Sequence, residues 1–292
     1  MSQPGLISLI VTTFNAPQAL QRVLECLDRI RDGAFEIIVA DDGSGPDTAE
    51  VIRRFRQTAH APLRHVWQPH RGFRAAESRN RAVAASCGDY LVFLDGDCLA
   101  RRDFLLAHRA LAEPGWFVAG NRALLSEGFS RRLLDSPDAT ARWSARTPAG
   151  WIGARLRGDV NRLTPLLRLP AGWPRKNKPR EWRGAKTCNL GVWRKDFLAV
   201  DGFDESYVGW GHEDADLVVR LIRHGVLRKE GRFATSVLHL WHAPAPRQGL
   251  SDNEQRLAEV LAAQRTRAVT GFSHQHGEPA STAQQVPQGA SE

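Results

Sequence analysis

The residues with the most evident chemical capacity lie in one short segment, WGHEDAD at positions 210–216. Trp210 offers an apolar ring face on which a sugar can stack, and Glu213 and Asp214 offer carboxylates that can accept a proton or hydrogen bonds. The alternative is an acidic helix start, because carboxylates there face unpaired N–H groups and the positive end of the helix dipole. Other polar groups in the chain favour the chemical interpretation.

Two of those groups have the composition of a metal site. The segment DGD at 95–97 follows an apolar run typical of a strand, and His239 and His242 follow a second such run. Carboxylate oxygens and neutral imidazoles bind divalent cations, so the sequence predicts a cation beside a general base. Taken singly, the aspartates could form a hairpin turn and a histidine could be satisfied in the core. The helix-like run at 104–111 disfavours the hairpin.

Two weaker segments could bind a nucleotide. In DDGS at 41–44 a carboxylate at a strand end can accept from a nucleobase N–H or from ribose hydroxyls; a turn that caps the next helix is the alternative. In GFRAAESRN at 72–80 arginines stand at a helix beginning, where they can meet phosphate, or else they form a solvated basic face. The glycines fit neither GxGxxG nor GxxxxGK[ST], so neither a Rossmann dinucleotide site nor a P-loop is supported.

Hydrophobic spacing predicts the elements that position these groups. Strands are expected at 6–14, 35–40, 64–68, 90–94, 187–193 and 233–238, and helices at 17–31, 47–55, 75–86, 104–111, 214–224 and 253–269. Alternating strands and helices indicate parallel βαβ units, with ligands bound beyond the carboxyl ends of the strands. The aspartates at 41, 42, 95 and 97 all fall at such ends.

Composition sets limits on the class of protein. The 292 residues contain 42% hydrophobic and 25% charged side chains, which is ordinary for a globular protein with a sizeable core. The net charge of +8 suits an anionic partner. Four scattered cysteines argue against a disulfide framework or a zinc ribbon. There is no long apolar run, and residues 6–14 lack the basic lead-in of a signal peptide, so we expect a cytoplasmic protein.

Taken together, these segments resemble glycosyltransferase family 2 with the GT-A fold. IVTTFN at 10–15, DDGS at 41–44 and DGD at 95–97 follow that family's order and spacing, and the resemblance extends from residue 6 to 242. The second half is similar to the C-terminal region of the beta-1,4-galactosyltransferases and of bacterial chondroitin-type polymerases, whose GWGGED motif is matched by GWGHED at 209–214. The resemblance implies an α/β fold with a mixed, mostly parallel central sheet flanked by helices.

The resemblance also implies a nucleotide-sugar site. Its residues would be Thr13, Asn15, Asp41, Asp42, Phe73, Arg74, Asp95 and Trp210. Within this set, Asp41 would bind the uracil or the ribose, and Asp95 would bind the ribose. Phe73 and Arg74 match an aromatic-and-arginine element that lines the pocket in that family.

Metal binding and catalysis would fall to a second set. Asp97 would bind the cation, and His242 matches the metal histidine of the galactosyltransferases. His239 falls where that family has a methionine ligand, which leaves open whether one or both histidines coordinate. Glu213 would contact the acceptor or donor sugar, and Asp214 would be the general base.

The expected activity is an inverting, metal-dependent sugar transfer from a UDP-sugar to a hydroxyl of a glycan. Mn²⁺ or Mg²⁺ would offset charge on the leaving diphosphate, while Asp214 removes the acceptor proton. His212 replaces a glycine of the motif, and this departure bears on the fit of donor or acceptor.

The segment 151–186 provides the main indication of the acceptor. Ten lysines and arginines lie there among tryptophans, against only Asp159 and Glu181. Such a segment suits an anionic membrane surface, to which the protein would bind peripherally, or an anionic lipid-linked glycan. A flexible loop with solvated charges is the alternative. The preferred acceptor is a bacterial cell-surface glycan, such as lipopolysaccharide core or capsule.

The expected organisation is a single domain over 1–272. It comprises a nucleotide-sugar-binding half at 1–125, a basic insertion at 126–186 and an acceptor-binding, catalytic half at 187–272, before a disordered tail at 273–292.

A basic nucleic-acid-binding protein is a rival function, but the basic residues are not accompanied by a recognisable nucleic-acid-binding motif, so no nucleic acid is expected. A catalytically silent sugar-binding protein on the same fold is another. A sugar-nucleotide pyrophosphorylase is disfavoured because no Gly-rich loop with Arg or Lys follows the first strand.

Overall fold

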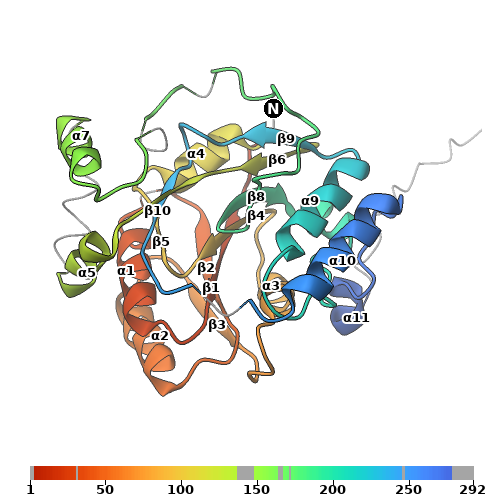
Figure 1. Ribbon diagram of the computed structural model, residues 1–292. Helices are drawn as coiled ribbons and strands as arrows, with labels where there is room; N and C mark the ends of the chain where they lie inside the picture. The colour runs from red at the N-terminus through yellow and green to blue at the C-terminus, as the bar shows by residue number, and fades with distance from the viewer. Residues whose placement is uncertain are drawn as a thin grey trace, which may run out of the picture.

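A twisted sheet of seven strands forms the centre of the molecule (Figure 1). The computed structural model describes residues 3–30, 32–136, 148–163, 167–170, 172–244 and 247–277. In chain order the strands of this sheet are β1 (Ile7–Thr13), β2 (Phe35–Asp41), β3 (Leu63–Trp67), β4 (Tyr90–Asp95), β6 (Trp116–Ala119), β8 (Asn189–Trp193) and β9 (Leu227–Glu230). A smaller sheet contains β5 (Cys98–Leu99), β7 (Arg122–Leu124) and β10 (Val237–His239).

Helices cover both faces of the large sheet (Figure 1). They are α1 (Pro17–Leu27), α2 (Pro46–Thr58), α3 (Ala75–Ala84), α4 (Phe104–Leu111), α5 (Glu127–Asp135), α7 (Pro148–Leu156), α8 (Arg194–Ala199), α9 (Glu213–Arg223), α10 (Leu250–Ala262) and α11 (Phe272–His276). In Figure 1, α1 and α2 lie on one side of the sheet, and α3, α9, α10 and α11 lie on the other.

The two faces of the sheet form two separate hydrophobic cores. On β1, Leu9 and Val11 pack with α1 and α2, whereas Ile10 packs with α3 and α9. Successive side chains of a strand point to opposite faces, so a strand covered on both faces must be apolar throughout. This requirement explains the continuous apolar run at the start of the chain.

The strand order is β3-β2-β1-β4-β8-β6-β9. Strands β1, β2, β3 and β4 are parallel, whereas β8 is antiparallel to both β4 and β6. The mixed, mostly parallel sheet flanked by helices that the sequence predicted is therefore confirmed.

Most predicted elements agree with the structure to within a few residues, but two do not. The strand predicted at 233–238 is confined to β10, because Phe233 has a φ of 65° and the chain turns between Gly231 and Thr235. The helix predicted at 253–269 is α10, which begins at Leu250 and ends at Ala262. The helix ends there because Ala263 is extended, with a ψ of 156°, and Val269 N donates instead to the buried Asp204 carboxylate at 2.8 Å.

The expectation of a disordered tail at 273–292 does not hold for residues 273–276, which belong to α11. Phe272 is buried in the core beside α3, and Asp201 accepts hydrogen bonds from Ser273 N at 2.8 Å and Ser273 Oγ at 3.0 Å. A single buried aromatic and one capping carboxylate therefore anchor a short helix that has no periodicity of its own. Residues 278–292 lie outside the described part of the chain.

A buried ion pair fixes α9 against the segment before it. Arg220 and Asp216 are both fully buried, with Arg220 Nε 2.8 Å from Asp216 Oδ2. Arg220 Nη1 also donates to the carbonyls of Val200 at 2.6 Å and Gly202 at 2.8 Å. The guanidinium thus ties the helix to the loop that leads to the WGHEDAD segment.

Replacing Arg220 with methionine is expected to lower the free energy of unfolding by about 3–5 kcal/mol, because Asp216 would keep a buried charge whose remaining described cationic neighbour, Arg265, lies 3.9 Å away. Urea denaturation of the two proteins measures the difference. Arg53→Met is the matched control, since Arg53 pairs with Glu50 on the surface and its loss should leave stability almost unchanged. Equal changes in stability for the two substitutions would contradict the stabilising role of the buried Arg220–Asp216 pair.

Among the described residues, none of the helices combines the length and the apolar character that crossing a lipid bilayer requires.

Candidate active site

The polar residues at the carboxyl ends of β1, β2 and β4 meet at one edge of the sheet. Thr13 pairs in register with Asp41, and Thr12 pairs with Asp95. Because these strands are parallel neighbours, residues far apart in the chain lie side by side there. The expectation that the acidic segments gather at one edge is therefore correct.

Asp41 and Asp42 are turned toward protein partners at this edge. Asp41 is fully buried; its Oδ1 accepts from Ser44 N at 2.8 Å, and its Oδ2 lies 2.9 Å from His65 Nε2. Burial alone would raise the pKa of Asp41, but the hydrogen bonds from His65 and Ser44 outweigh it and hold the pKa below its ordinary value. Asp42 accepts from Gln68 Nε2 and from the backbone of the 72–80 segment. Both carboxylates thus shape the turns that surround the edge.

Thr13 and Asn15 frame the same edge. Thr13 is 5% exposed, and among the described residues its Oγ1 has no hydrogen-bond partner. Asn15 has a φ of 44° and its Oδ1 accepts from Gly45 N at 2.9 Å. Asn15 therefore holds the loops after β1 and β2 together, whereas Thr13 keeps a hydroxyl available.

Phe73 and Arg74 connect the edge to the WGHEDAD segment. Arg74 N donates to Asp42 Oδ2 at 2.7 Å, and Gly209 N donates to the carbonyl of Phe73 at 2.8 Å. The Arg74 side chain pairs with Glu77 at 3.0 Å, and the Phe73 ring remains 38% exposed. The two residues thus join the first half of the chain to the second.

Asp97, His239 and His242 converge on one point. His239 Nε2 lies 3.4 Å and His242 Nε2 lies 3.3 Å from the same atom, Asp97 Oδ2. One ligand atom from each of the three residues lies within 4.8 Å of the other two. Two imidazoles and one carboxylate form a donor set that suits Mn²⁺, Fe²⁺ or Zn²⁺.

The fold holds this set in place through backbone pairing. β10 is antiparallel to β5, with His239 opposite Cys98, and Leu240 N donates to the carbonyl of Asp97 at 2.9 Å. His242 Nδ1 lies 2.8 Å from the carbonyl of Ala243. A backbone acceptor on one ring nitrogen fixes the imidazole so that the other presents its lone pair, which is the usual support of a metal-binding histidine. The residues present therefore fit a divalent cation.

The electrostatics of the cluster favour a cation as well. Burial raises the pKa of Asp97, but hydrogen bonding to His242 and the charges of both histidines outweigh it, so the net pKa is lowered. Burial lowers the pKa of His239, which keeps that imidazole neutral. The hydrogen bond to Asp97 raises the pKa of His242 to about 9, so a cation has to displace a proton from this ring.

Arg79 links the two halves of the site. It is 4% exposed and donates from Nε to Thr12 Oγ1 at 3.1 Å, from Nη1 to Glu213 Oε1 at 2.9 Å and from Nη2 to Asp95 Oδ1 at 3.3 Å. Burial raises the pKa of Asp95 to about 6, although the charge of Arg79 opposes the rise. The sequence interpretation included Arg79 only among the arginines at a helix beginning and gave it no such role. Glu213 is therefore ion-paired with Arg79, and its expected contact with the acceptor or donor sugar stays a prediction.

Asp214 and Trp210 lie on either side of a tight turn. Gly209, Gly211 and His212 have φ values of 86°, 99° and 75°, in the left-handed region that favours glycine. That geometry accounts for the glycine found at the His212 position in the motif of the galactosyltransferases. The turn starts α9 at Glu213 and leaves Trp210 40% exposed.

The pKa of Asp214 lies near neutrality, as its expected role of general base would require. Burial raises it to about 7, the charge of Glu213 adds to the rise, and the charges of Arg79 and Lys186 oppose it. Its Oδ1 accepts from Ala215 N at 2.8 Å at the start of α9. This hydrogen bond holds the carboxyl group at the helix N-terminus.

Several charges of the basic segment 151–186 have partners inside the protein. Arg168 pairs with Asp103 at 3.1 Å, and Lys176 pairs with Glu113 at 2.7 Å. Arg175 is 4% exposed and donates to backbone carbonyl groups. The interpretation of this segment as a loop with solvated charges is therefore wrong for Arg168 and Arg175, whereas Lys176 forms its ion pair at the surface.

Comparison with known proteins adds family information to this geometry. Residues 8–146 match the family model described as Glycosyl transferase family 2. Residues 168–242 match the model described as the N-terminal domain of galactosyltransferase. The first match contains Asp41, Asp95 and Asp97. The second contains Glu213, Asp214 and the two histidines that converge on Asp97.

Curated relatives are similar over most of this chain. A validoxylamine A glucosyltransferase of Streptomyces hygroscopicus subsp. jinggangensis is 30% identical over 235 residues, which are 77% of this chain and 53% of the relative. The chondroitin synthase of Escherichia coli is 25% identical over 242 residues, which are 75% of this chain and 32% of the relative. The chain spans about half the length of the first relative and about a third of the second.

Solved structures share the fold. A mannosyltransferase of Pyrobaculum calidifontis, in complex with GDP-Man and Mn²⁺, has a TM-score of 0.53 and 18% identity, over 90% of this chain and 64% of that chain. Staphylococcus aureus TarS 1–349, in complex with UDP, has a TM-score of 0.57 and 13% identity, over 92% of this chain and 68% of that chain. Both matches support the fold predicted from the sequence. Residues 8–146 therefore belong to glycosyltransferase family 2, the chain has the GT-A fold, and residues 168–242 form a galactosyltransferase-type segment.

Proposed function

We propose that this protein transfers a sugar from a UDP-sugar to a hydroxyl group of a glycan, with inversion at the anomeric carbon and with a divalent cation in the site. The observation that carries the proposal is the convergence of His239 and His242 on Asp97, within two residues of Asp95 at the edge of the sheet. Arg79 connects that edge to the segment that holds Asp214. A cation site and a candidate base thus belong to one continuous network.

The residues would divide the work as follows. Asp97, His239 and His242 would hold Mn²⁺ or Mg²⁺, which when bound would neutralise charge on the leaving diphosphate. The two imidazoles favour Mn²⁺ over Mg²⁺, because Mg²⁺ prefers oxygen ligands. Asp95 would accept hydrogen bonds from the ribose, and Arg79 would hold the Asp95 carboxylate in position. The exposed Trp210 ring would stack on a sugar.

Asp214 would take the proton of the acceptor hydroxyl as that oxygen attacks the anomeric carbon. Attack from the face opposite the departing UDP forms the new bond and breaks the old one in a single displacement, which inverts the configuration. Glu213 would support this step indirectly, because its ion pair with Arg79 fixes the start of α9.

The rate constant kcat/KM is expected to rise with pH through an apparent pKa of about 7, because only the deprotonated Asp214 can accept a proton. The pKa lies above the ordinary carboxyl value, so activity is present above it and falls as the pH drops below about 7. Initial rates at saturating Mn²⁺, from mildly acid to mildly alkaline pH, measure the profile. A flat profile over that interval would contradict the role of Asp214.

A nucleotide-sugar donor is supported by the bound GDP-Man and UDP of the two structures with the same fold. The galactosyltransferase-type segment favours UDP for this chain. The chondroitin synthase relative favours a growing polysaccharide as the acceptor, whereas the validoxylamine A glucosyltransferase is named for a different acceptor. Synthesis of a bacterial cell-surface polysaccharide or lipopolysaccharide remains the proposed context.

The surface of the basic segment is the proposed contact for an anionic acceptor or membrane. A cavity of about 240 Å³ opens there beside Trp173, whose ring is 51% exposed. Basic side chains that line this cavity are Arg175, Lys178, Arg228 and Arg232. An aromatic face among cationic groups suits an anionic sugar or a lipid-linked phosphate.

The deciding experiment is calorimetric titration of the wild-type protein with UDP, with and without Mn²⁺, followed by a screen of UDP-sugars for transfer. Binding that requires Mn²⁺ and turnover of at least one UDP-sugar are the expected results. A parallel titration with GDP identifies the base. Metal-dependent UDP binding without transfer to any glycan would favour a catalytically silent nucleotide-binding protein instead.

A further inference from the structure

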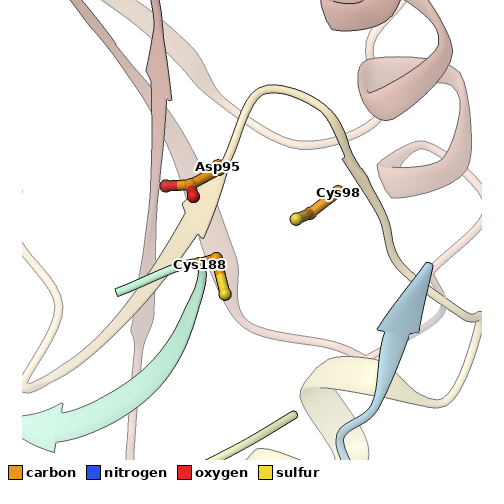
Figure 2. Close-up of side chains that lie close together, drawn as sticks. All are labelled: Asp95, Cys98 and Cys188. Atoms are coloured by element: carbon orange, nitrogen blue, oxygen red, sulfur yellow. The ribbon is translucent and has the colours of Figure 1, made fainter. Parts of the chain in front are cut away.

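A second set of potential ligands lies next to the Asp97 cluster. Figure 2 shows Asp95, Cys98 and Cys188, which come from the end of β4, the start of β5 and the segment before β8. One carboxylate oxygen and the two sulfur atoms lie within 4.8 Å of one another. The galactosyltransferase-type resemblance gives neither cysteine a role.

Local structure brings these three residues together. Gly96 N donates to the carbonyl of Thr12 at 2.7 Å, and a Cβ on Gly96 would lie 2.9 Å from that oxygen. The turn can therefore pass close to β1 only with glycine at this position, and it places Cys98 beside Asp95. β8 is antiparallel to β4, with Leu94 opposite Asn189, so Cys188 approaches the carboxyl end of β4.

We propose that Asp95, Cys98 and Cys188 form a site for a thiophilic divalent cation, such as Zn²⁺, Cd²⁺ or Co²⁺. This site shares no residue with the Asp97–His239–His242 set but borders it, because Cys98 Sγ lies 3.4 Å from Asp97 Oδ1. The cation would form one bond to oxygen and two to sulfur, the two thiol protons would leave to solvent, and water would complete a tetrahedron. Two sulfurs that each bind zinc at about 2.3 Å lie at most about 4.6 Å apart, so little movement of the side chains is required.

Burial and charge agree with this assignment. Cys98 is 0% and Cys188 is 4% exposed, whereas the Asp95 side chain is 29% exposed, so solvent reaches the site only from the side of the carboxylate. Arg122 lies close enough to interact electrostatically with both cysteines and with Asp95. Two thiolates and one carboxylate carry three negative charges, which a divalent cation and Arg122 together neutralise, while the charge of Arg79 is shared between Asp95 and Glu213.

The sharing of Asp95 has a consequence that rests on the proposed function. If Asp95 binds the ribose of the donor, a cation that takes its carboxylate competes with the nucleotide. Thiophilic cations would therefore inhibit the enzyme at a site distinct from the one that the activating cation uses.

The test is titration of the full chain with Co²⁺ in the presence of a phosphine reductant, which keeps both thiols reduced. Thiolate bonded to Co²⁺ gives a near-ultraviolet charge-transfer absorption, which histidine and carboxylate ligands do not produce. The band is expected in the wild type and in the His239→Ala/His242→Ala double variant. It should be lost in Cys98→Ser and in Cys188→Ser, whose folding is checked by circular dichroism.

Cys87→Ser is the matched control, since Cys87 is an exposed cysteine outside the cluster, and the band should persist in it. Absence of the band in the wild type, or its survival in both serine variants of the cluster, would overturn the proposal. A second titration tests competition: Cd²⁺ should weaken UDP binding in the presence of Mn²⁺ in the wild type but not in Cys188→Ser. If UDP does not bind even without Cd²⁺, the proposed function fails, while the band still decides the cation site.

Discussion

Replacing Asp97 with alanine is expected to abolish Mn²⁺-dependent UDP binding and sugar transfer. Asp97 Oδ2 is the atom on which both imidazoles converge, so its loss removes the only carboxylate of the described Asp97–His239–His242 set. Removal of a residue that hydrogen-bonds to a metal ligand, without itself binding the metal, typically lowers metal affinity by about 10–100-fold. Loss of a ligand itself should therefore cost more than about 100-fold. Calorimetry with UDP at fixed Mn²⁺ measures this change.

Asp103→Ala is the control for that substitution. Asp103 lies a few residues along the chain, is half-exposed and pairs with Arg101 and Arg168, so its loss should leave UDP binding unchanged. Single His239→Ala and His242→Ala variants then show whether one or both histidines coordinate. Normal Mn²⁺-dependent binding in Asp97→Ala would contradict the metal site.

Replacing Asp214 with asparagine is expected to lower kcat by about 10²–10⁴-fold while UDP binding remains intact. Asparagine keeps the shape of the side chain, and its amide oxygen can still accept from Ala215 N, so the start of α9 should be preserved. What the amide lacks is the capacity to take a proton. Single-turnover transfer rates, together with UDP calorimetry on the same protein, separate chemistry from binding.

A control substitution tests whether loss of a negative charge at any helix start would have the same effect as Asp214→Asn. Asp252 is exposed in the first turn of α10, so Asp252→Asn makes the same chemical change outside the site and should leave turnover unchanged. If Asp214→Asn binds UDP and turns over at a near-normal rate, another residue is the base. The pH profile of kcat/KM provides an independent check, because its rise through about 7 should disappear in the variant.

Some features of the candidate site were predictable because they depend on strand ends. β1, β2 and β4 are long apolar runs with acidic residues directly after them, and parallel packing brings such ends to a common edge. The prediction that Asp97 and the histidine pair form one metal site rests on the same logic together with family resemblance. The structure brings their ligand atoms within 4.8 Å of one another.

Other features were not predictable, because partner choice depends on three dimensions. The nucleotide contacts expected of Asp41 and Asp42 stay predictions, but the hydrogen bonds that their oxygens accept from His65, Ser44 and Gln68 could not be read from the sequence. Arg79 looks like any arginine on a helix face, yet it is buried between Asp95 and Glu213. Nothing in the local spacing distinguishes a carboxylate that binds a ligand from one that shapes a turn.

Short elements were missed for a related reason. β5, β7 and β9 contain two, three and four residues, too few for any hydrophobic period to be visible. Pairing with distant strands forms them, as when β10 pairs with both β5 and β7. Helix α11 likewise depends on burial of Phe272 and on the cap from Asp201.

The α/β alternation and the residues whose chemistry suits a cation and a base could be read from the sequence, because they follow from local periodicity and residue type. The family and its mixed, mostly parallel sheet were implied by the resemblance of the motifs and their order along the chain. Tertiary structure alone decided that His239 lies opposite Cys98, that Arg79 joins Asp95 to Glu213, and that Cys188 approaches Asp95. These contacts form between strands and helices far apart in sequence, where register and burial, rather than local preference, select the partner.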